Sequence, residues 1–99
     1  MPTLLAKKEV FLWLKERRKT IDIRRGNPRR GDRMVFISGP HRLEMRVVST
    51  QSGKLSDLVR EDNFRQVIPS AVTLGDAFVY LGRIFGSVDG VFTAYTVED

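Results

Sequence analysis

The chain has 99 residues, of which 41% are hydrophobic and 29% charged, with a formal net charge of +5 and no cysteine. These values are typical of one folded domain over residues 1–99, and they exclude disulfides and cysteine zinc sites. No apolar run approaches the ~20 residues of a membrane-spanning helix, and the N-terminus lacks a signal-peptide pattern, so we expect a cytoplasmic protein without a membrane partner.

The first predicted element is a helix over residues 7–17. Val10, Trp13 and Leu14 recur there at helical spacing among good helix formers. Trp13 is therefore expected in the core rather than on a base-stacking surface.

A strand is predicted next, over residues 19–24. Its apolar period is two, so Ile21 and Ile23 face one side while Asp22 and Arg24 face the other. The glycine, asparagine and proline that follow end this strand in a cationic loop, called here the basic loop (residues 25–30).

The rest of the chain alternates strands and helices. Residues 33–38 and 41–50 form a hairpin around a Gly-Pro turn, and a short helix near 55–61 leads into a loop closed by proline. Thr73 is a candidate N-cap for a helix that ends at Gly86, and residues 90–97 alternate as a last strand.

Charge is concentrated in the first half of the chain, where residues 1–50 carry a net +8 and residues 51–99 a net −3. Between Lys15 and Arg33 there are nine basic residues and three acidic ones. Such clustering is typical of a protein that binds a polyanion, and it makes RNA the leading partner. A solvated charged surface is the alternative reading.

Several segments in this order resemble the ASCH family, small domains of the PUA-like superfamily that are associated with RNA. They are a first helix, a basic turn into KTIDIR, GD before RMVFIS, RLEMRVV, a helical excursion, VTLGDAFVYLGRIFG and a final strand that opens GVFTA. The match extends from about Lys7 to Val97. The resemblance implies an α+β fold. This fold is a small PUA-like β-barrel of about five strands, with two to three flanking helices and a cleft between barrel and helices.

The resemblance also implies a site. In the family, a lysine, a polar or acidic residue and an arginine on the first barrel strand line the cleft, and they correspond to Lys19, Asp22 and Arg24. One branch resembles amidohydrolases of 4-acetylcytidine, with a threonine nucleophile where this chain has Asp22, so an acyl-threonine route is lost and general-base chemistry remains. Some relatives look like ribonucleases. Glu61, and next Asp62, are candidates for the family's glutamate.

The sequence offers no sign of a cofactor or metal. The single histidine, His41, follows a proline at a turn and has no partner histidine or cysteine, and no phosphate-loop or dinucleotide motif is present.

Three hypotheses follow. The first is an RNA-binding module that holds single-stranded or structured RNA by the basic loop and the cleft, with phosphate contacts from Arg17, Arg18, Lys19, Arg24, Arg25, Arg29 and Arg30. The second is a hydrolase on RNA or a modified nucleoside, with Lys19, Asp22, Arg24 and Glu61 in its site. The third is an interaction protein whose basic loop binds an acidic partner.

Overall fold

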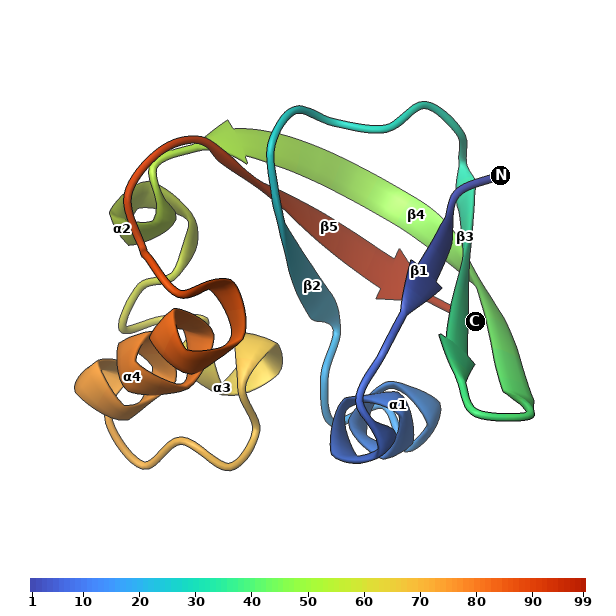
Figure 1. Ribbon diagram of the computed structural model, residues 1–99, viewed down its shortest axis with the longest axis horizontal. Coiled ribbons are helices and arrows are strands. Elements are labelled where there is room, and N and C mark those ends of the chain that lie inside the picture. Colours follow the sequence, from blue (N-terminus) through green and yellow to red (C-terminus); the bar gives the residue numbers. More distant parts are fainter.

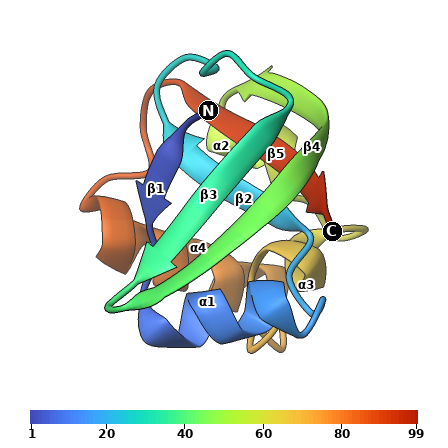
Figure 2. The ribbon, with the colours of Figure 1, turned by 90° about the vertical axis from the view of Figure 1, so that its right-hand side faces the viewer.

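Five strands form one mixed sheet that curves into a half-barrel (Figures 1 and 2). In sheet order they are β1 (Thr3–Leu5), β3 (Arg33–Ser38), β4 (His41–Gly53), β5 (Phe92–Glu98) and β2 (Ile21–Arg25). The computed structural model describes residues 1–99. The β1 strand is parallel to β3, whereas the other neighbouring pairs are antiparallel.

Four short helices cover one end and one side of this sheet (Figure 1). They are α1 (Lys8–Lys15), α2 (Leu55–Leu58), α3 (Phe64–Val67) and α4 (Leu74–Phe85). The longest, α4, begins at a capping box in which Thr73 Oγ1 accepts from the Asp76 amide and the Asp76 carboxylate accepts from the Thr73 amide, both at 3.1 Å. None of the four helices has the length and apolar composition needed to span a lipid bilayer.

One hydrophobic cluster fills the space between the half-barrel and the helices. Phe36 from β3 and Phe92 from β5 are fully buried, as are Leu14 from α1 and Ala77 from α4. Trp13 is 7% exposed and packs near the ring of Tyr80, which confirms its predicted place in the core. The core therefore joins α1 and α4 to the half-barrel through one shared cluster.

The α+β class and the strands from residues 21 to 97 are confirmed, with three differences. The chain has four short helices rather than two to three, because the segment predicted as a loop contains α3. A fifth strand, β1, precedes α1, where no strand was predicted. β4 also continues to Gly53, and a register shift between Val47 and Ser49 lets it follow the curvature of β5.

The half-barrel is open along one line, called here the seam, which lies between the edge strands β1 and β2. No backbone ladder joins these two strands, since each pairs on one side only. Side chains must therefore fill the seam, and those of β2 are the ones that the sequence singled out.

Candidate functional site

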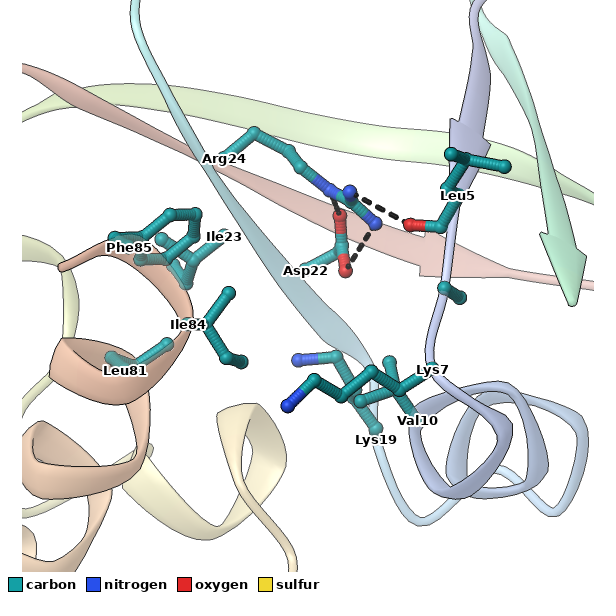
Figure 3. A pocket seen from close by; sticks show the side chains of 11 residues that line it. Leu5, Lys7, Val10, Lys19, Asp22, Ile23, Arg24, Leu81, Ile84 and Phe85 are labelled. Carbon is teal, nitrogen blue, oxygen red and sulfur yellow. Dashed lines mark hydrogen bonds and ion pairs between the residues drawn. The ribbon is translucent and has the colours of Figure 1, made fainter.

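A cavity of about 90 Å³ lies at the seam, between β2, the β1–α1 connection and the last turns of α4 (Figure 3). We call it the seam cavity. Its lining combines apolar walls with three cations and one carboxylate. The lining residues are Leu5, Ala6, Lys7, Val10, Lys19, Asp22, Ile23, Arg24, Leu81, Ile84 and Phe85.

Lys19 is buried at the base of this cavity, with 4% of its surface exposed. Its Nζ donates to the carbonyl oxygens of Ile21 at 2.8 Å and Val67 at 2.6 Å, which ties β2 to the end of α3. Burial lowers the pKa of Lys19 from 10.5 to about 8, with the nearby Asp22 charge opposing this shift and the Arg24 charge adding to it. Lys19 is therefore mostly protonated at neutral pH, and the neutral amine becomes the main form above about pH 8.

Asp22 and Arg24 lie on one face of β2, as their spacing of two predicts. Arg24 Nε donates to Asp22 Oδ2 at 2.7 Å and its Nη2 to Oδ1 at 3.5 Å, while the Asp22 side chain is only 4% exposed. Arg24 Nη1 also donates to the carbonyl of Leu5 at 3.0 Å. Because Leu5 belongs to β1, this guanidinium bridges the two edge strands across the seam (Figure 3).

The fourth predicted catalytic residue lies elsewhere. Glu61 is exposed in the turn before α3, beside Asp62 and outside the lining of the seam cavity. The structure thus brings together Lys19, Asp22 and Arg24, and it separates Glu61 and Asp62 from them.

Two of the predicted phosphate-binding residues are exposed in the basic loop. Arg29 and Arg30 form no side-chain hydrogen bond or ion pair, and the Arg29 amide donates to the Tyr95 hydroxyl at 2.9 Å, which anchors the loop to β5. Arg17 pairs with Asp99, and Arg18 lies 3.9 Å from the Glu16 carboxylate. The free guanidinium groups of this region are therefore those of Arg29 and Arg30.

Arg25 has a different environment from the rest of the basic loop. Its guanidinium donates to the carbonyls of Asp89 at 2.8 Å, Ser87 at 2.5 Å and Phe85 at 3.3 Å, and it lies 4.7 Å from the centre of the Phe92 ring. A cation at this position satisfies the carbonyls that follow the last turn of α4. Arg25, although exposed, therefore uses three of its donors to position the end of α4 and the loop after it.

Sequence reasoning missed part of the lining. Lys7 is exposed, precedes α1 and lines the cavity. The sequence alone does not show which of the two adjacent lysines, Lys7 or Lys8, faces the cavity. Ile84 and Phe85 belong to the apolar pattern of α4, which indicates burial without indicating a cavity wall. The helical period of α4 was the only feature of the sequence that could have pointed to these two residues as part of the cavity lining.

No family model matches this chain, and no curated protein matches it either. Among solved structures, it is similar to the crystal structure of hypothetical protein PH0355, with a TM-score of 0.80 and 15% sequence identity over 98% of this chain and 96% of that one. At this identity the likeness shows a shared fold alone. The α+β half-barrel with its short helices is therefore a known arrangement that extends over nearly the whole of both chains.

Proposed function

We propose that this protein is an RNA-binding module of the ASCH type, which holds single-stranded or structured RNA by its basic loop and its seam cavity. The observation that carries this proposal is the charge of the cavity. Lys7, Lys19 and Arg24 line it against the single carboxylate of Asp22, which leaves a net charge of +2. A cationic recess suits the phosphates of such a polyanion, and the exposed apolar side chains of Leu5 and Ile84 in its lining suit the apolar faces of unpaired bases outside it.

The basic loop supports the same reading. Arg29 and Arg30 are exposed and have no acidic partner, so binding to phosphates would not require them to give up an existing ion pair. Such contacts position a strand without reading its sequence. A role in binding RNA is compatible with the cytoplasmic location predicted above.

Salt dependence tests this proposal. The logarithm of the association constant should fall linearly with the logarithm of salt concentration for a labelled single-stranded RNA. In the variant Arg29→Ala/Arg30→Ala the slope should be shallower by about 1.4, since each lost phosphate contact removes about 0.7. The matched control Arg42→Ala/Arg65→Ala removes the same charge from the β3–β4 hairpin and α3, and it should leave the slope near that of the wild type.

The outcome that would refute RNA binding is equally direct. Absent binding at low ionic strength, or an affinity that salt does not change, would exclude the proposal. Binding of an acidic peptide without binding of RNA would instead favour the interaction-protein hypothesis.

A hydrolase acting on RNA or 4-acetylcytidine is the second candidate, and the environment of Lys19 favours it. A buried lysine with a pKa of about 8 is able to exchange a proton near neutral pH, and Asp22 lines the same cavity. Turnover of 4-acetylcytidine or labelled RNA should then be lost in both Lys19→Ala and Asp22→Ala but kept in Lys8→Ala. No turnover by the wild type at several pH values would end this candidate.

A further inference from the structure

We infer that the seam cavity takes a phosphate monoester, namely the terminal phosphate of an RNA strand, rather than an internal phosphate or a base. This inference rests on the proposed function and names the part of the RNA that the same site would select. It follows from the free hydrogen-bond donors, the charge and the size of the cavity.

The cavity contains donors that the protein itself leaves unused. The Lys19 ammonium has three N–H groups, and two of them donate to the carbonyls of Ile21 and Val67. Arg24 directs three of its five N–H groups to Asp22 and the Leu5 carbonyl, which leaves two. Lys7 forms no side-chain hydrogen bond, and its Nζ lies 5.9 Å from the centre of the Tyr80 ring. Figure 3 shows the Lys7 and Lys19 side chains directed into the space between β2 and α4.

The charge of the cavity matches a monoester better than a diester. Its three cations and one carboxylate leave a net +2. A phosphate monoester carries about −1.5 to −2 at pH 7, as phosphorylated side chains do, whereas each internal phosphate of a strand carries about −1. The terminal phosphate therefore gains more from the same three cations.

The size of the cavity points the same way. Its volume of about 90 Å³ is below the roughly 150 Å³ of an apolar cavity that encloses benzene, so it has no room for a base and its sugar. A monoester has one substituent and enters a small recess end-on, whereas a diester continues in two directions. Leu5 and Ile84, which line the cavity and are 79% and 39% exposed, offer apolar contact to the terminal nucleoside outside.

The Asp22 carboxylate is the one group in the lining that repels a phosphate. Its oxygens lie 2.7 and 3.5 Å from Arg24 nitrogens, so the pair is close to neutral as a unit. Asp22 also fixes the direction of the Arg24 guanidinium, whose remaining N–H groups are then held in place before a ligand arrives.

The test uses one ten-nucleotide RNA in three forms: with a 5′-phosphate, with a 3′-phosphate, and with hydroxyls at both ends. Fluorescence anisotropy at pH 7 should give at least one phosphorylated form an affinity about fivefold above that of the hydroxyl form, as one added close charge pair in water provides. Lys7→Ala should abolish this preference. Lys8→Ala, which removes the neighbouring exposed lysine outside the cavity, should keep it.

The outcomes separate this inference from the proposed function. Equal affinities for the three forms, or an equal loss for all three in Lys7→Ala, would overturn the inference and leave RNA binding intact. If no RNA form binds, the proposed function fails, and NMR titration with uridine 5′-monophosphate against uridine decides the inference. Shifts of the Lys7, Lys19 and Arg24 side-chain signals with the nucleotide alone support it, and their absence overturns it.

Discussion

The buried Lys19 should give this protein an unusual dependence of stability on alkaline pH. Its pKa is about 8 in the folded protein, against 10.5 for an exposed lysine. Between these values the unfolded chain holds a proton that the folded protein has released. Stability rises with pH wherever the unfolded state binds more protons, so the free energy of unfolding should increase over this interval.

The magnitude follows from the width of that interval. At 1.36 kcal/mol per pH unit, the gap from about 8 to 10.5 corresponds to a gain of about 3 kcal/mol. Tyr80 acts in the opposite sense at higher pH, because burial and its hydrogen bond to Glu9 raise its pKa above the ordinary value of 10.0. The folded state then keeps a proton that the unfolded state loses, so stability should pass through a maximum near pH 10 and fall above it.

Urea denaturation at half-unit steps from pH 7 to 10.5 measures this curve. The comparison is with Lys19→Met, which keeps an unbranched apolar stem but has no titrating amine. Its absolute stability is not the readout, since the variant also loses the bonds to the Ile21 and Val67 carbonyls. In Lys19→Met the free energy of unfolding should no longer rise between pH 8 and 10. In the wild type, ¹³C NMR of the lysine ε-carbons should show one lysine that titrates near pH 8, below the others. A wild-type curve that is flat or falling there, or the same rise in Lys19→Met, would refute the reasoning.

Three further predictions concern side chains around the seam and α4. Arg24→Ala leaves the buried Asp22 carboxylate unpaired, so the free energy of unfolding should fall by about 3 kcal/mol in urea denaturation, and adding Asp22→Asn should restore part of it. Arg25→Ala removes three bonds to carbonyls after α4, so the thermal midpoint should fall while RNA affinity changes less than in the basic-loop double variant. Thr73→Ala removes the capping box and should cost about 1 kcal/mol in urea denaturation.

Each of these has a contrary result. An Arg24→Ala protein as stable as the wild type would mean that water compensates Asp22. A loss of RNA affinity in Arg25→Ala with an unchanged thermal midpoint would place Arg25 among the phosphate contacts. An unchanged free energy of unfolding in Thr73→Ala would show that solvent replaces the cap.

The elements that the sequence predicted well are those with a local signature. The period of α4, with Thr73 before it and Gly86 after it, depends only on neighbouring residues, and so does the alternation that places Asp22 and Arg24 on one face of β2. In contrast, β1 has three residues and exists through parallel pairing with β3, some thirty residues away along the chain. No local pattern in so short a segment predicts that partner.

The site shows the same division. Alternation predicted that Asp22 and Arg24 share a face, but the Leu5 carbonyl that completes the Arg24 environment depends on the position of β1. From the sequence, Arg25 is assigned to the basic loop because its neighbours are Arg24 and Gly26. Its pairing opposite Phe92 at the end of β2 is what delivers it to the carbonyls after α4. Likewise, chain order alone carried no information on whether Glu61 would reach the cavity.

The bridge from Arg24 to Leu5 couples the stability of the N-terminal strand to the chemistry of the cavity. One guanidinium joins the edge strands and also lines the proposed binding site. A substitution of Arg24 that favours a different ligand would therefore also weaken the attachment of β1. The protein would tolerate it only if another side chain donated to the Leu5 carbonyl, or if the folded state were stable enough to lose this bond. Diversification of this site is accordingly easier at Lys7 or Ile84, whose side chains line the cavity without bridging the strands.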